Sequence, residues 1–204
     1  MAAVRRRARR SSVGLAVVAA VAFVGTYTVV DRRLQADLLP EQDLPADVQT
    51  EVDQTWGRFV EVFGPRRRCF DDVSLLLVTE LDGGDARYVV PERRIEILIP
   101  TSPRRFRESL VHELAHHVEH TCGRFAQFRP RFIALLAEGG QAEPSGSGDT
   151  IAWADPDVGW EARPAELWAE TVVAVVNGER VRHERTMPLP EGAEALVLTW
   201  ADGG

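Results

Sequence analysis

Four of the chain's five histidines lie within positions 112–120 of one segment. Ser102 and Pro103 suit the cap and the first position of a helix there, and Gly123 suits its end. Apolar residues recur on one side of this helix, as expected for a buried stripe: Leu110, Val111, Leu114, Ala115 and Val118. The segment is therefore predicted to be an amphipathic helix that carries its histidines on the remaining surface.

The sequence His112-Glu113-Leu114-Ala115-His116 has the pattern H-E-x-x-H. Residues four apart share a helical face, so both imidazoles can bind one metal ion. Glu113 lies beside that face and is placed to act as a base on a metal-bound water. We predict His112 and His116 as ligands and Glu113 as the catalytic base. The alternative is a helix whose His and Glu side chains only face solvent.

A zinc site with two histidines needs a third protein ligand. The extended pattern H-E-x-x-H-x-x-G-x-x-H does not fit, because Glu119 stands at the Gly position and Cys122 at the last His position. Cys122 as a thiolate ligand is an alternative, and it would leave Cys69 as an odd thiol. His120 lies one turn beyond His116, too far for the same ion, and is interpreted as a nearby or solvent-facing residue.

A second candidate helix, "RPAELWAETVVAVV" at 163–176, carries Glu166 and Glu170 on one face. Glu166 is predicted as the third metal ligand. Glu170 is predicted to accept a hydrogen bond from the free nitrogen of a ligating histidine, which such ligands usually need. Without the H-E-x-x-H motif, the same pair would be interpreted as a solvated acidic stripe.

H-E-L-A-H followed by E-L-W-A-E resembles the glutamate-liganded zincins (gluzincins), and most of all the E-x-F-A-E helix of the anthrax lethal factor-like metalloproteases. The resemblance covers residues 95–175 through two short motifs. It implies that Glu166 binds zinc and that Glu170 supports the site. Trp168 stands where the family usually has Phe.

The resemblance implies an α+β fold, a minimal zincin-like domain. A small, mostly antiparallel sheet would pack on the HExxH helix and on a second ligand helix, with one Zn²⁺ per chain. In such enzymes an edge strand aligns the peptide substrate by strand addition. The strand-like run "RIEILI" at 94–99 is the matching candidate.

Enzymes of this type usually also place a Tyr or His to stabilise the oxyanion. Tyr88, in a predicted strand, and His183 are the candidate stabilisers, and Arg163 is a cationic alternative. Each is also compatible with a plain surface position. His117 is predicted to point away from the metal, at the surface.

Periodicity and turn residues give the remaining elements. Segment 139–162 is Gly- and Ser-rich and then Trp-rich, and predicts either a rim over the cleft or a loop with packing aromatics. The predicted regular elements are a helix at 46–63, strands at 73–78, 86–90 and 94–99, helices at 125–137 and 164–177, and a terminal amphipathic segment at 191–200.

The sequence of the N-terminus predicts a membrane anchor. "RRRARR" is followed by 18 uncharged residues at 13–30, which span about 27 Å as a helix. Arginine precedes the span, so we expect a cytoplasmic basic segment at 1–12, a single-pass transmembrane signal-anchor at 13–30, a linker at 31–44 and an extracytoplasmic zincin-like metallopeptidase domain at 45–204. A small-residue cleavage site at 20–22 is the alternative, and gives a secreted protein.

Charge and cysteine content agree with an exported domain. Residues 34–204 hold 17 Arg and 30 acidic residues, a net charge of −13, which argues against nucleic acid as a partner. Two cysteines outside the cytoplasm favour one disulfide, Cys69–Cys122, over two unrelated thiols. It would anchor the end of the histidine helix in front of the first predicted strand.

These features predict a membrane-anchored zinc metallopeptidase that hydrolyses peptide or protein substrates through a zinc-activated water and Glu113 as the base. One alternative is a membrane-anchored zinc domain that binds a partner without cutting it. Another is a plain structural domain that binds no metal.

Overall fold

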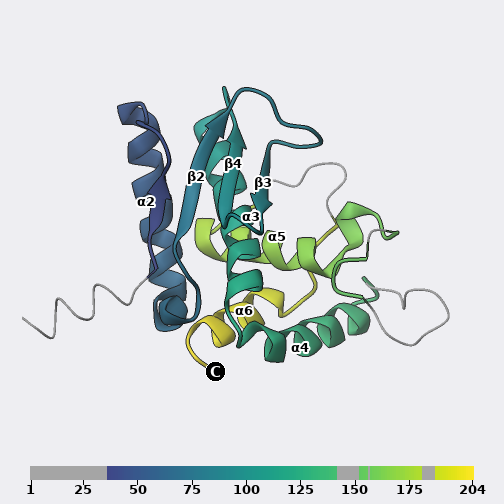
Figure 1. The fold of residues 1–204 in the computed structure, drawn as a ribbon. Helices are drawn as coiled ribbons and strands as arrows, with labels where there is room; N and C mark the ends of the chain where they lie inside the picture. Colours follow the sequence, from purple (N-terminus) through teal and green to yellow (C-terminus); the bar gives the residue numbers. More distant parts are fainter. Residues whose placement is uncertain (1–35, 142–151, 156, 181–186) are drawn as a thin grey trace, which may run out of the picture. The chain divides into compact units, whose positions relative to one another are not determined.

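The computed structural model describes residues 36–141, 152–155, 157–180 and 187–204. Within this part of the chain, a four-stranded mixed sheet is combined with five α-helices (Figure 1), so the predicted α+β class is confirmed. No helix in these ranges has the length and apolar character needed to cross a membrane. The predicted span at 13–30 and the candidate His183 lie outside the described residues.

The sheet has the strand order β1-β2-β4-β3. Its strands are β1 (Leu38–Pro40), β2 (Val73–Val78), β3 (Ala86–Val89) and β4 (Arg94–Leu98). The β1–β2 and β2–β4 pairs are parallel, and only β3–β4 is antiparallel. The prediction of a mostly antiparallel sheet is therefore wrong. β3 and β4 form a hairpin, but β2 pairs with β4 instead of its neighbour in sequence, and β1 forms within the predicted linker.

The position of strand 94–99 also differs from expectation. β4 lies between β2 and β3, so the edge strand next to the histidine helix is β3 and not β4. The sequence of β4 alternates between apolar and charged residues, which is the pattern of a strand with one exposed face and did not indicate a central position. In the structure the charged face is covered, since Glu96 is only 4% exposed. Arg87 and Arg94 both pair with that carboxylate, at 2.7 and 2.8 Å.

The helices form where periodicity predicted them. They are α2 (Ala46–Phe63), α3 (Pro103–Thr121), α4 (Phe125–Glu138), α5 (Pro164–Asn177) and α6 (Ala193–Ala201). The Ser102 hydroxyl caps α3 by accepting from the Arg105 N–H, at 3.3 Å. α5 ends at Gly178, whose φ of +71° lies in the left-handed region that glycine adopts without strain.

α3 packs against the sheet through β3 and β4 and against α5 (Figure 1), so the two predicted ligand helices lie side by side. The completely buried Trp168 of α5 strengthens this contact, because its indole N–H donates to the Ala115 carbonyl of α3 at 3.2 Å. A phenylalanine has no such donor. The surrounding aromatic cluster consists of Phe63, Phe125, Phe128, Phe132 and Trp200.

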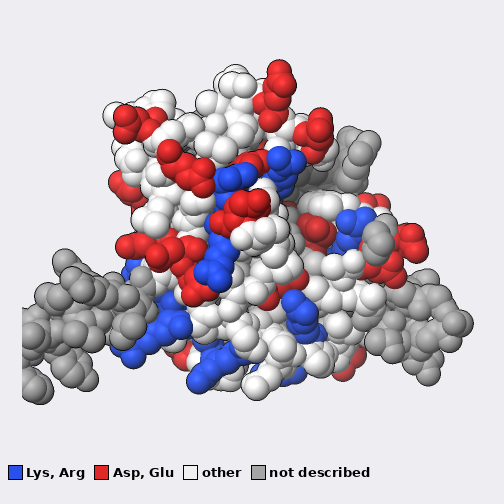
Figure 2. All heavy atoms as spheres, viewed as in Figure 1, with Lys and Arg blue, Asp and Glu red and all other residues white. Residues whose placement is uncertain are grey.

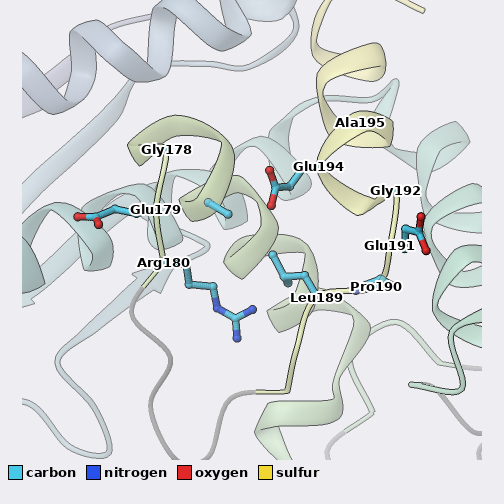
Figure 3. Close-up of a pocket in the computed structure, with 10 residues that line it drawn as sticks. Gly178, Glu179, Arg180, Leu189, Pro190, Glu191, Gly192, Glu194 and Ala195 are labelled. Carbon is cyan, nitrogen blue, oxygen red and sulfur yellow. The ribbon is translucent and has the colours of Figure 1, made fainter.

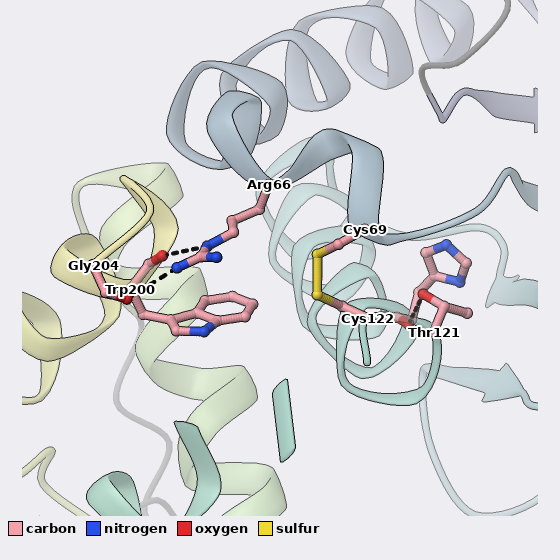
Figure 4. The surroundings of a disulfide bond; sticks show 7 residues. Arg66, Cys69, Thr121, Cys122, Trp200 and Gly204 are labelled. Atoms are coloured by element: carbon pink, nitrogen blue, oxygen red, sulfur yellow. Dashed lines mark hydrogen bonds between the residues drawn. A yellow bond between two sulfur atoms is a disulfide. The ribbon is translucent and has the colours of Figure 1, made fainter. Parts of the chain in front are cut away.

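The predicted disulfide Cys69–Cys122 is confirmed. It joins the end of the 3₁₀ turn η1 (Gly64–Cys69) to the C-terminus of α3 (Figure 4). Closing 53 residues of chain stabilises the fold by about 4 kcal/mol in the chain-entropy account. Because Cys122 is bonded to Cys69, it is not a thiolate ligand, and that alternative is excluded.

The same region ties down the C-terminus (Figure 4). Arg66 of η1 donates to the carbonyls of Trp200 and Gly204, at 2.7 and 3.0 Å. Its guanidinium also lies over the Trp200 ring. These contacts hold the C-terminal end of α6 against η1.

Candidate metal centre

α3 and α5 bring three potential ligand atoms to one point. His112 Nε2 lies 3.0 Å from Glu166 Oε2, and His116 Nε2 lies 3.5 Å from the same oxygen. The two imidazole Nε2 atoms are 3.3 Å apart. His112, His116 and Glu166 therefore form a group that can hold a metal ion, as the sequence predicted.

The three distances fit a small tetrahedral ion. Bonds of about 2.0–2.1 Å in tetrahedral geometry place neighbouring ligand atoms about 3.3–3.4 Å apart. The observed spread of 3.0 to 3.5 Å brackets that value. Nitrogen and carboxylate oxygen atoms also form a donor set typical of a divalent transition metal.

Each imidazole is held by a second carboxylate on its far side. His112 Nδ1 lies 3.2 Å from Glu170 Oε1, as predicted, and Arg180 forms an ion pair with the other oxygen of Glu170. His116 Nδ1 lies 3.2 Å from Glu119 Oε2. With Nδ1–H donating to these carboxylates, both Nε2 lone pairs point at the common centre, which is the arrangement that metal-binding histidines need.

The metal-free cluster binds protons tightly. Burial lowers the pKa of His112, but its hydrogen bonds to Glu166 and Glu170 outweigh burial and raise that pKa to about 10. For His116, the bonds to Glu119 and Glu166 likewise outweigh burial and raise the pKa to about 9. Burial raises the pKa of Glu166, but the two imidazoles lower it well below its usual range. Both imidazoles thus favour the protonated form, and a metal ion would compete with these protons for the Nε2 atoms.

A metal must displace these protons, so we expect its apparent affinity to increase as the pH rises from 6 to 8. Each displaced proton contributes about a tenfold gain per pH unit while the pH stays below the pKa of its histidine. Calorimetric titration with Zn²⁺ in buffers of different ionisation enthalpy counts the protons released. An affinity independent of pH, without proton release, would contradict this account of the cluster.

Glu113 lies next to the cluster with a buried side chain. Burial raises its pKa, while His112, His116 and the backbone N–H of Tyr88 act in the opposite direction and do not cancel the effect. A carboxyl whose pKa is shifted toward neutrality suits a group that must take up and release a proton. The role of Glu113 as a catalytic base stays a prediction.

The cluster opens to solvent through two adjoining hollows of about 570 and 340 Å³. Ala86 of β3, His112, Glu113 and Trp160 line both. The Trp160 ring stacks on His112 at 5.9 Å and is 41% exposed, so Trp160 borders the cleft, whereas Trp153 of the same segment packs on Phe125 at 5.4 Å. Each of the two alternatives for segment 139–162 therefore describes one of its tryptophans. An accessible site with three protein ligands leaves a position for a further ligand.

Another hollow of about 570 Å³ lies between the C-terminal end of α5 and the start of α6 (Figure 3). Its charged lining consists of Arg180, Glu179, Glu191 and Glu194, and it includes no histidine. Among the described residues, the group that can hold a metal ion therefore lines the cleft formed by the first two hollows and not this one.

Comparisons with protein-family models, with curated proteins and with solved structures gave no match. The interpretation of the site therefore depends on its own geometry.

The Tyr88 hydroxyl, one candidate oxyanion stabiliser, lies 3.0 Å from His117 Nδ1 and so has a partner outside the metal cluster. Burial, with a contribution from Asp71, outweighs the effect of Arg93 and raises the pKa of Tyr88 to about 12, so the phenol stays neutral. Arg163, the cationic alternative, donates to the Val158 carbonyl at 2.9 Å.

The prediction that His117 lies at the surface is wrong, because its side chain is completely buried. Its Nε2–H donates to the Asp71 carbonyl at 2.7 Å, and its Nδ1 accepts from Tyr88. Burial lowers its pKa, in keeping with this neutral tautomer. His117 thus fixes edge strand β3 to α3. His120 is exposed, as one interpretation expected, and stacks on Tyr88 at 5.8 Å.

The sequence prediction missed Glu119, Arg180 and Trp153. Glu119 had a usable signal, since it lies three positions after His116 and therefore on the same face of α3. Trp153 precedes α5 in the sequence and Arg180 follows it, and both lie outside the helices. Helical spacing therefore could not indicate that they lie near the site.

Figure 2 shows arginine side chains interleaved with acidic ones on one face of the molecule. Ion pairs of this kind join Arg67 to Asp37 and Arg105 to Asp85. The arginines of the described surface are thus partly neutralised by neighbouring carboxylates.

Proposed function

We propose that the chain is a zinc-dependent metallopeptidase of the gluzincin type, with His112, His116 and Glu166 as the ligands of one Zn²⁺. The observation that carries the proposal is the convergence of these three ligands beside the buried Glu113 in an open cleft. A purely structural zinc site is closed by four protein ligands, whereas the described residues supply three at this cluster. We further propose that residues 13–30 anchor it with the domain outside the cytoplasm, as its disulfide supports.

When bound, zinc would supply Lewis acidity at the substrate carbonyl and lower the pKa of water. Glu113 accepts the proton of the attacking water and passes it to the leaving amine. Glu170 and Glu119 keep the two imidazoles oriented. The Trp160 ring limits the space beside His112.

Strand β3 supports a peptide as the substrate. It is an edge strand of the sheet, and its residues Ala86, Arg87 and Tyr88 line the smaller hollow. An extended peptide that adds to this edge would run past Glu113, which already accepts a hydrogen bond from the Tyr88 backbone.

The test is zinc-dependent hydrolysis. The purified full-length chain should contain about one zinc ion and should cleave members of a fluorogenic peptide library. Removal of zinc with a chelator should abolish cleavage, and stoichiometric Zn²⁺ should restore it. A chain that neither contains nor takes up zinc would refute the proposal.

A second candidate function is a zinc-containing domain that binds a peptide without cutting it. The engagement of the Tyr88 hydroxyl by His117 favours this alternative, because it leaves the described cleft without that neutral oxyanion donor. Zinc binding together with peptide binding, but without any cleavage, would support it.

A further inference from the structure

Glu119 is a buried carboxylate with three partners from three parts of the chain. Its side chain is 4% exposed. One oxygen contacts His116 Nδ1, and the other accepts from the Trp153 indole N–H at 2.6 Å. Arg129 of α4 approaches that same oxygen at 3.4 Å. The carboxylate that orients His116 is therefore itself held in place.

Trp153 is fixed independently of Glu119. Its ring packs on Phe125 and Phe132 of α4, with centroids at 5.4 and 6.1 Å, and the Arg129 guanidinium lies over it at 5.4 Å. Its main-chain carbonyl accepts from the Ala165 N–H at 3.0 Å. That amide belongs to the first turn of α5 and directly precedes Glu166.

Trp153 thus contacts the supports of two ligands that come from different helices. Its side chain holds the carboxylate behind His116, and its main chain holds the turn that presents Glu166. We propose that Glu119 and Trp153 form a positioning pair that sets His116 and Glu166 in their relative places before the metal binds. This inference rests on the proposed zinc centre. It adds a determinant of metal affinity whose two residues are not themselves metal ligands.

The ligands of a preorganised site lose less conformational freedom when the metal binds, so disrupting the pair should lower the zinc affinity. Loss of a hydrogen-bond partner behind a ligand typically costs 10- to 100-fold in metal affinity. We expect Glu119→Gln to lower zinc affinity by about that factor. Trp153→Phe keeps the ring but removes the N–H donor, and should give a smaller loss in the same direction. The double variant should be no worse than Glu119→Gln alone, because both act through one carboxylate.

The experiment uses the full-length chain, its two single variants and the double variant. Trp56→Phe is the matched control, since Trp56 stacks on Phe59 of α2 and lines neither of the two hollows at the cluster. Zinc affinity is measured by chelator competition, and the absorption spectrum of the Co²⁺-loaded protein reports the ligand geometry. Thermal unfolding of the metal-free proteins reports packing.

The proposal predicts a weaker affinity and an altered Co²⁺ spectrum in both single variants, and neither change in Trp56→Phe. Wild-type affinity and spectrum in Glu119→Gln and Trp153→Phe would overturn it. So would losses that simply add in the double variant, or a lower unfolding temperature with unchanged metal binding. If the wild-type chain binds no zinc, the proposed function itself fails, which is a different result.

Discussion

Glu113→Gln should abolish peptide hydrolysis and leave the zinc content unchanged. Gln keeps the size and shape of Glu but cannot act as a base at neutral pH, so the attacking water loses its proton acceptor. General acid–base catalysis contributes about 100- to 10,000-fold, and we expect a loss of that order in kcat. Steady-state hydrolysis of the best library peptide, with zinc measured on the same samples, gives the result.

Glu61→Gln is the control for this experiment. It makes the same chemical change at an exposed position of α2 that lines neither hollow of the cleft, and should leave both kcat and zinc content as in the wild type. A Glu113→Gln variant with undiminished turnover would show that another group is the base. A variant that also lost its zinc would show that Glu113 helps to hold the metal.

The helices and the ligand set were predictable because both follow from local rules. The period of apolar residues predicted α2, α3 and α5, and spacing on one helical face predicted His112 with His116 and Glu166 with Glu170. The convergence of His112, His116 and Glu166 on one point depends on how α3 packs on α5. Trp168 contributes to that packing through a hydrogen bond that periodicity cannot reveal.

The sheet was less predictable because strand order is a non-local property. "VSLLLV", "ARYVV" and "RIEILI" have the composition of strands, but nothing in them states which strand pairs with which. β2 pairs with β4, and β3 is left at the edge beside the cluster. The buried position of His117 has a similar origin, since Tyr88 and Asp71 reach it from other parts of the fold.

Glu166→Ala tests whether Glu166 is the third metal ligand, which both the family resemblance and the geometry of the cluster indicate. Structural zinc sites with four ligands bind with about 10–16 kcal/mol, so the loss of one ligand, at an even share of about 2.5–4 kcal/mol, should weaken zinc binding by about 100- to 1,000-fold. Glu161→Ala is the matched control, because Glu161 is exposed, lines the larger hollow and precedes the same helix. It should bind zinc like the wild type in a chelator competition.

The same variant makes a second, metal-independent readout available. Glu166 hydrogen-bonds to both imidazoles and helps to raise the pKa of His112 and His116, whereas burial lowers them. Without Glu166, both pKa values should therefore fall, which NMR titration of the metal-free protein can follow. A lower zinc affinity together with lower histidine pKa values would show that Glu166 has two roles. It would stabilise the protonated imidazoles without metal and would bind the ion when zinc is present. Unchanged zinc affinity would mean that Glu166 is not a ligand, and the assignment of this site to the gluzincin type would fail.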